Sequence, residues 1–239
     1  MKMKKIGLVG GLGPASTVDY YLGLIELCRS EKGEDVYPEI VIDSVDMSEH
    51  TDAFSKGDYD KICDLLIESL TNLKSAGADV AAITANTEHI VWDKVVSRFP
   101  LPVISSVDEI VAEIKKCGYK KVLVFGTEFT MSSGLYENAF VKNGITPIVP
   151  DENDIKIIGN LIYPNLENGI VIPEDKVKMI ELAEKYISIY SADAMLLGCT
   201  EIPLMIKDGD VSVPTLNSTN IHIKAIYEYA KQERKNEYN

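Results

Sequence analysis

The sequence predicts an α/β protein made of two similar halves, each containing a parallel sheet. Short apolar runs alternate with longer amphipathic runs along the chain, which is the pattern of strands joined by covering helices. The apolar share of 46% is enough for a sizeable buried core. Two segments also recur about 115 residues later, which indicates an internal duplication.

In the first half, each apolar run is followed by a segment with helical periodicity. The run at 6–9 ends in a glycine-rich loop, and Pro14 then favours the first turn of a helix. Between residues 58 and 76, leucines and isoleucines recur on one helical face. The expected strands are 6–9, 39–45, 79–84 and 102–105, and the expected helices are 17–29, 58–76, 87–99 and 107–117.

The second half repeats this alternation. Its expected strands are 121–125, 146–149, 194–197 and 213–216, with a helix from Thr130, two helical stretches between 151 and 189, and a last helix at about 219–232. Residues 231–239 are expected to form a solvated tail. The expected domains are 1–107 plus 217–239 for the N-terminal half and 108–216 for the C-terminal half.

The duplication relates two loops that bear polar residues. The segment at 5–10 resembles that at 121–126, and Ala85-Asn86-Thr87 occupies the position of Cys199-Thr200-Glu201. Ligands of open parallel sheets bind outside the carboxyl ends of the strands. We therefore expect the active site in a cleft between the two halves, lined by the loops after Val9, Thr84, Phe125 and Leu197.

Charge and cysteine content exclude several classes of partner. The formal net charge of −13 disfavours nucleic acid and anionic membrane surfaces, although a small anionic substrate is compatible with it. The basic N-terminus lacks the apolar run of a signal peptide, and no stretch is long enough to span a membrane. The four cysteines show no metal-binding spacing. We expect a cytoplasmic protein with free thiols and no metal site.

Cys199 is the leading candidate for chemistry. It follows an apolar run and precedes a short helix, where backbone N–H groups would stabilise a thiolate. The functional interpretation is a proton-transferring or nucleophilic thiol. The alternative is a small buried residue at a tight turn.

Other polar residues at predicted strand ends are candidates for holding a substrate carboxylate. Asn86 and Thr87 stand where a helix begins, so they are either helix caps or carboxylate ligands. Thr127 and Thr130, in the corresponding loop of the second half, leave the same two alternatives. His89 falls inside the predicted helix, which favours a structural role.

The glycine-rich loop at 10–14 suggests close approach of the backbone to a small ligand, with Gly11 and Leu12 as contacts. Its spacing is not that of a dinucleotide-binding loop.

Five short motifs together resemble the aspartate/glutamate racemase superfamily. They are Gly-Leu-Val-Gly-Gly-Leu-Gly-Pro at 7–14, Ser-Val-Asp at 44–46, Asn-Thr at 86–87, Phe-Gly-Thr with Phe-Thr-Met at 125–131, and Gly-Cys-Thr-Glu at 198–201. Their order and spacing agree with the family from residue 5 to about residue 225.

The resemblance implies an amino-acid racemase that uses neither pyridoxal phosphate nor metal. Two residues, usually cysteines, face each other across the substrate and exchange the α-proton. The family fold consists of two pseudo-symmetric Rossmann-like halves, often in a homodimer. Cys199 falls on the second catalytic cysteine, and Asn86, Thr87 and Thr200 fall on positions that bind the α-carboxylate. Thr127 and Thr130 fall near the ligand. The implied substrate is aspartate or glutamate.

The chain departs from this pattern at the first catalytic cysteine, whose position is taken by Ala85. Alanine cannot transfer a proton, and a positioned acid or base contributes about 10²- to 10⁴-fold. Water, Thr84 or another side chain is then the candidate acid/base for that face. Strand alternation turns the adjacent Thr84 away, however, and its hydroxyl is a poor base. Three alternatives remain: an impaired or modified racemase, a one-thiol decarboxylase or isomerase, and a non-catalytic carboxylate-binding protein.

Overall fold

The computed structural model describes residues 3–232, so the part of the predicted tail beyond 232 lies outside the described residues. Contacts divide the chain into two compact units. Unit 1 comprises Met1–Ser106 with His222–Asn239, and unit 2 comprises Val107–Ile221. Unit 2 is therefore an insertion between two sequence segments of unit 1. Each unit contains a four-stranded parallel sheet, which confirms the predicted fold class.

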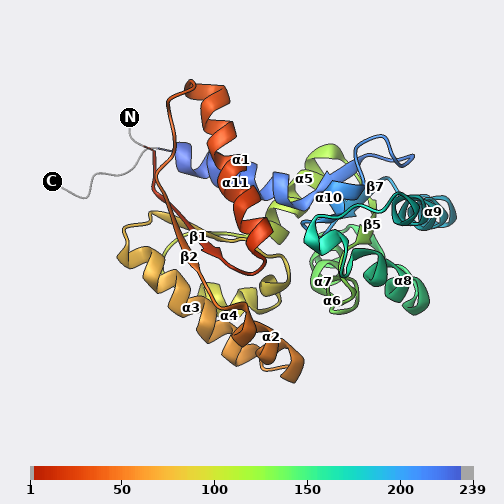
Figure 1. Ribbon diagram of the computed structural model, residues 1–239, viewed down its shortest axis with the longest axis horizontal. Coiled ribbons are helices and arrows are strands. Elements are labelled where there is room, and N and C mark those ends of the chain that lie inside the picture. The colour runs from red at the N-terminus through yellow and green to blue at the C-terminus, as the bar shows by residue number, and fades with distance from the viewer. Residues whose placement is uncertain (1–2, 233–239) are drawn as a thin grey trace. The chain divides into compact units, whose positions relative to one another are not determined.

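Unit 1 has the strand order β2-β1-β3-β4. Helices cover both faces of its sheet, with α1 and α11 on one face and α3 and α4 on the other (Figure 1). Its elements are β1 (Ile6–Gly10), α1 (Pro14–Lys32), β2 (Ile40–Ser44), α2 (Met47–Lys56), α3 (Tyr59–Ser75), β3 (Val80–Ile83), η1 (Thr87–Val91), α4 (Trp92–Arg98), β4 (Val103–Ile104) and, after unit 2, most of α11 (Ser218–Lys231).

Unit 2 has the equivalent order β6-β5-β7-β8. Its sheet is also covered on both faces, by α8 and α9 on one side and by α5 and α7 on the other. Its elements are α5 (Ser106–Cys117), β5 (Lys121–Phe125), α6 (Glu128–Ser132), α7 (Leu135–Lys142), β6 (Thr146–Ile148), α8 (Glu152–Ile162), η2 (Leu166–Asn168), α9 (Pro173–Tyr190), β7 (Ala194–Leu197), α10 (Ile202–Met205) and β8 (Thr215–Asn217).

Side-chain alternation along the central strands produces two cores in each unit. In β1, Ile6 and Leu8 pack under α1 and α11, whereas Val9 packs under α3. In β5, Leu123 and Phe125 pack under α8 and α9, whereas Val122 and Val124 pack under α5 and α7. The carboxyl ends of the central strands are consequently held rigidly from both faces.

The duplication extends to single hydrogen bonds. The carboxylate of Asp79 accepts from the backbone N–H of Lys5, and that of Asp193 accepts in the same way from Lys121. Both aspartates stand just before the second central strand of their sheet. This shared tie fixes the register of β1 with β3 and of β5 with β7.

Helix α2 is absent from the sequence prediction, which places no element between the strand at 39–45 and the helix at 58–76. Only His50 and Ala53 of this helix are buried, so few of its ten residues carry an apolar signal. The signal lies instead in its N-cap, because Asp46 accepts from the backbone N–H of Ser48. Among residues 3–232, no helix is long and apolar enough to cross a membrane.

Candidate functional site

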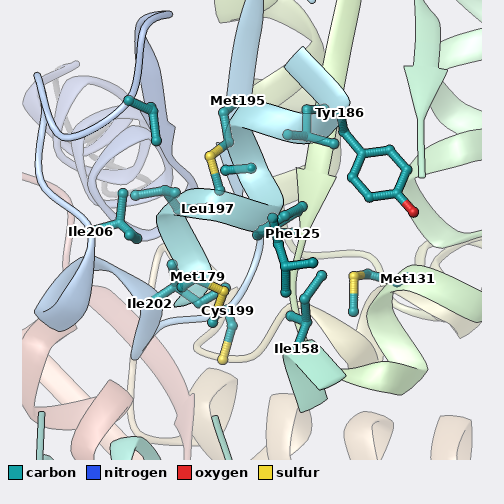
Figure 2. Close-up of a cluster of buried hydrophobic side chains, with 14 of the residues drawn as sticks. Phe125, Met131, Ile158, Met179, Tyr186, Met195, Leu197, Cys199, Ile202 and Ile206 are labelled. Atoms are coloured by element: carbon teal, nitrogen blue, oxygen red, sulfur yellow. The ribbon is translucent and has the colours of Figure 1, made fainter. Parts of the chain in front are cut away.

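The loop after β7 places Cys199 at the edge of a packed core. Gly198 begins the loop and donates its N–H to the carbonyl of Phe125 at 2.7 Å. A Cβ at Gly198 would lie 3.0 Å from that carbonyl oxygen, so a larger residue would displace the loop. The Cys199 side chain is 7% exposed and packs within the apolar cluster that includes Met179 and Ile202 (Figure 2).

Cys199 forms a hydrogen bond that the sequence analysis did not anticipate. Its Sγ donates to Oε2 of Glu201 at 2.9 Å, and Glu201 is itself only partly buried. Partial burial and the charge of Glu201 also raise the pKa of the Glu167 carboxyl. Unit 2 thus brings together the buried thiol of Cys199, the carboxylate of Glu201 that accepts its hydrogen bond, and the carboxyl group of Glu167.

The sequence analysis expects the loop to stabilise a Cys199 thiolate, and this expectation is wrong for the resting site. Burial raises the pKa of the Cys199 thiol well above its ordinary value, and the charge and hydrogen bond of Glu201 raise it further. The backbone N–H groups of Glu201 and Ile202 do lower it, as the loop position predicts, but burial outweighs them. The resting group is therefore a neutral thiol that can donate a proton.

Thr127 caps the short helix α6, and Thr130 lies in the first turn of that helix. Thr127 Oγ1 accepts from the Thr130 N–H at 3.2 Å, and the two hydroxyls are 2.9 Å apart. Thr130 is 3% exposed and packs against Gly126, and its methyl carbon also lies near Gly198. The structure thus brings Thr130 beside the Cys199 loop, while Thr200 is half-buried within that loop.

In unit 1, the glycine-rich loop folds tightly against the end of β2. Gly11 has a φ of 87°, and a Cβ there would lie 2.5 Å from the carbonyl oxygen of Val45, so only glycine fits. Its N–H donates to Oγ1 of Thr17 at 3.0 Å. Leu12 is 8% exposed and belongs to the core on the α3 side of the sheet.

Thr84 is fully buried and its hydroxyl is engaged. It donates to the carbonyl of Val9 at 3.0 Å and lies 3.2 Å from Oγ1 of Thr17. Ser16 in turn donates to the carbonyl of Thr84 at 2.6 Å. These bonds tie the ends of β1 and β3 to α1, which argues for a structural role at this position.

Ala85 and Asn86 are each 7% exposed and lead into η1, which Thr87 begins. The carbonyl of Ala85 lies 3.1 Å from Nδ1 of His89, whose Nε2 accepts from the backbone N–H of Ser106. Burial lowers the pKa of His89 to about 4, so the ring is neutral. His89 therefore holds the loop to α5, in agreement with the structural role predicted for it.

Sequence reasoning missed two partners of these loops. One is Glu201, whose position two residues after Cys199 was the available signal. The other is the buried pair of His50 and Glu88, with 3.2 Å between Nδ1 and Oε1, which joins α2 to η1. Between residues 3 and 232, no three His, Cys, Asp or Glu side chains are arranged to hold a metal ion.

Comparisons with known proteins agree on one family. Residues 9–226 match the family described as Asp/Glu/Hydantoin racemase. An aspartate racemase homologue from Pyrococcus horikoshii OT3 is 35% identical with a TM-score of 0.87, and the match covers 95% of this chain and 99% of that one. An aspartate racemase from Picrophilus torridus is 26% identical with a TM-score of 0.71, over 98% and 97% of the two chains.

Curated relatives match over shorter segments. A broad-specificity amino-acid racemase from Bacillus subtilis (strain 168) is 30% identical over 142 residues, which are 58% of this chain and 61% of the relative. A glutamate racemase from Aquifex aeolicus (strain VF5) is 26% identical over 67% of this chain and 62% of its own. The matches thus span about three fifths of the length of these two relatives.

Proposed function

Because the chain belongs to the Asp/Glu/hydantoin racemase family, we propose that it racemises an acidic amino acid by proton transfer at the α-carbon. The observation that carries the proposal is the bond from Cys199 to Glu201 at the carboxyl end of a central strand. Relatives named as aspartate and glutamate racemases support the choice of aspartate or glutamate. Cys199 and its loop supply one acid/base, and neither pyridoxal phosphate nor metal is required.

Glu201 gives the neutral thiol a route to become a base. When the thiol proton passes to Oε2 of Glu201, the resulting thiolate can remove the substrate α-proton. Accepting the α-proton converts the thiolate back into a thiol, which can return a proton to the carbanion on that same face, and the proton on Glu201 then passes back to the sulfur. Racemisation further requires a proton donor on the opposite face. Backbone N–H groups of Glu201 and Ile202 stabilise the negative sulfur while it exists.

We also propose that the loop after β3 binds the same substrate as the loop after β7. Asn86, Thr87 and Thr200 would hold the α-carboxylate, with Thr127 and Thr130 nearby and with Gly11 and Leu12 lining the ligand. The shared cleft between the two loops remains a prediction, as do a homodimer and a cytoplasmic location. Sedimentation of the purified chain tests the dimer.

Ala85 sets the expected limit of the reaction. It occupies the place of the family's first cysteine, so the opposite face of the substrate has no thiol there. A water molecule or another side chain would have to serve that face. We therefore expect a racemase that is impaired or modified relative to a two-thiol enzyme.

One-thiol chemistry is the second candidate function. A neutral thiol beside a carboxylate is suited to deliver a proton to one face of a planar carbanion, as a decarboxylase or isomerase would require. The missing thiol at Ala85 favours the same interpretation. A third possibility, a non-catalytic carboxylate-binding protein, predicts ligand-dependent thermal stabilisation without any proton exchange.

Proton NMR of L- and D-aspartate and L- and D-glutamate in deuterated water tests the proposal. Exchange of the α-proton together with formation of the opposite enantiomer supports racemisation. Single-face deuterium incorporation without a change of configuration supports one-thiol chemistry. Cys199→Ala should abolish exchange, whereas Cys117→Ala, which removes an exposed thiol, should leave it unchanged. Undiminished exchange in Cys199→Ala would reject the role of this cysteine.

A further inference from the structure

The turn that carries Cys199 is held at the peptide unit that joins Leu197 to Gly198. The N–H of Gly198 donates to the carbonyl of Phe125 in β5 at 2.7 Å. The carbonyl of Leu197 accepts from Oγ of Ser218 at 2.8 Å. Both groups belong to one planar peptide unit, so a hydrogen bond on each side fixes its orientation. The direction in which the chain enters Cys199 is set at this peptide (Figure 2).

Ser218 provides its hydrogen bond where the pairing of β7 with β8 ends. Leu197 pairs with Asn217, the last residue of β8, and Ser218 then begins α11. Ser218 is fully buried and Leu197 nearly so. Water therefore cannot replace the hydroxyl as a donor to the Leu197 carbonyl, and the loss of this bond would leave the peptide less constrained.

The helix that bears Ser218 is anchored one turn further along. The Nε2 of His222 lies 2.9 Å from the carbonyl oxygen of Ile104, and its Nδ1 lies 2.8 Å from the hydroxyl of Tyr20. Burial lowers the pKa of His222 to about 3, so the ring is neutral. Because a carbonyl can only accept, Nε2–H donates to Ile104 and Nδ1 accepts from Tyr20. The first turn of α11 is thus tied at both ends, which keeps the Ser218 hydroxyl in place.

The equivalent serine of unit 1 makes a different contact. Ser106 begins α5 in the same register relative to β3 and β4 as Ser218 has relative to β7 and β8. Its hydroxyl lies 3.4 Å from each ring nitrogen of His89. Both units therefore have a buried serine at this position, and in unit 2 its hydroxyl bonds to the strand that leads to the thiol.

We propose that Ser218 is a positioning residue for the thiol of Cys199. Its hydroxyl holds the peptide at 197–198, and this peptide directs the following turn so that the backbone N–H groups of Glu201 and Ile202 reach the sulfur. The expected effect on turnover rests on the proposed function, whereas the effect on the thiol itself does not.

Alkylation of Cys199 by iodoacetamide in the full-length chain, measured over a range of pH by peptide mass spectrometry, tests the proposal. Ser218→Ala should move the pH profile to higher pH and slow alkylation about threefold at a fixed pH, because a misdirected turn weakens the favourable N–H groups. Ser218→Thr keeps the hydroxyl and should restore the profile. The exposed thiol of Cys117 is the internal reference and should react at an unchanged rate.

Ser106→Ala is the matched control, because it removes a buried hydroxyl at the equivalent position of unit 1. It should leave the alkylation of Cys199 unchanged. If the chain racemises aspartate or glutamate, Ser218→Ala should also lower kcat about tenfold while KM stays within about twofold. Alkylation without substrate keeps the test independent of that activity. A shifted profile in a chain without racemase activity would reject the proposed function and still support the role of Ser218.

Three results would overturn the proposal. The first is an unchanged Cys199 profile in Ser218→Ala, even if thermal unfolding shows a loss of stability, because the bond would then be merely structural. The second is an equal effect of Ser218→Ala and Ser106→Ala. The third is a profile that moves to lower pH, which would indicate lost burial of the sulfur instead of a lost orientation of the turn.

Discussion

The loop after β3 and the loop after β7 occupy equivalent places in two sheets of the same topology, yet they are equipped differently. The β7 loop carries a neutral thiol bonded to Glu201, whereas the β3 loop has a methyl group at Ala85 and, at the position of Glu201, a threonine. The backbone bond that leaves the strand is nonetheless retained, since the Thr84 N–H donates to Val9 as Gly198 donates to Phe125. The backbone arrangement at the two strand ends is thus the same, whereas only the loop after β7 carries a thiol.

Restoring the missing thiol should produce the largest change. Ala85→Cys is expected to raise the rate of racemisation by about 10²- to 10⁴-fold, because it gives the second face of the substrate a positioned acid/base. Enantiomer formation and α-proton exchange in deuterated water provide the measurement. The double variant Ala85→Cys/Cys199→Ala is the control and should remain inactive. If Ala85→Cys brings no gain, the two loops do not serve one α-carbon.

Removing the proton acceptor of Cys199 should have the next largest effect. Glu201→Gln is expected to slow exchange about 10- to 100-fold and to lower the pKa of the thiol, because the Glu201 charge and hydrogen bond both raise it. The pH profile of iodoacetamide alkylation should therefore shift to lower pH. Glu167→Gln removes a neighbouring acid that does not bond to the thiol and should shift the profile less. An unchanged profile in Glu201→Gln would contradict the pairing.

Acid should distinguish the two units, because all three histidines of the chain lie in unit 1. Burial lowers the pKa of His89 to about 4 and that of His222 to about 3, whereas the unfolded value is near 6.5. Between the folded and unfolded pKa values, the unfolded chain binds protons that the folded chain does not bind. The contribution of these histidines to folding stability is therefore complete above about pH 6.5 and decreases as the pH approaches 4.

The loss should reach up to about 3 kcal/mol for His89 and about 5 kcal/mol for His222 once the pH falls below the folded pKa of each. Hydrogen exchange by mass spectrometry should show β4 and α11 opening before β5 and β7 as the pH is lowered. His222→Phe should make the loss in unit 1 shallower. Simultaneous opening of both units would show that these histidines do not set the acid limit.

Thr84→Val should have the smallest effect on chemistry. The substitution keeps the shape of the side chain but removes the hydroxyl bonded to Val9, so we expect about 1 kcal/mol of lost stability and exchange within about twofold of the unaltered chain. Thermal unfolding and the NMR assay measure the two effects. A large loss of exchange with unchanged stability would instead identify Thr84 as an acid/base.

The sequence was sufficient for the fold because strand and helix periodicities are local properties. The apolar runs that begin at Ile6 and Lys121 predict β1 and β5, and the duplication correctly relates their loops. Helix α2 escaped prediction because only His50 and Ala53 anchor it. Its Asp46 cap was the signal that could have found it.

The electrostatics of the candidate site could not be predicted in the same way. The position of Cys199 at a strand end correctly indicates favourable backbone N–H groups, but the sequence does not reveal how completely packing excludes water from its sulfur. Nor does it show the direction of the Glu201 side chain. The pKa of a thiol depends on the balance between burial, nearby charge and hydrogen bonds. The position of Cys199 in its motif therefore predicts the wrong direction of its pKa shift.

The insertion of unit 2 between two segments of unit 1 has a consequence for synthesis on the ribosome. Ile223, Ile226 and Tyr227 of α11 pack against Ile6 and Leu8 of β1, so a strand that is synthesised before unit 2 is covered by a helix that is synthesised after it. Residues 107–221 can complete their own cores while one face of the sheet in unit 1 is covered by α1 alone. During translation the part of that face that α11 will cover is an exposed apolar surface.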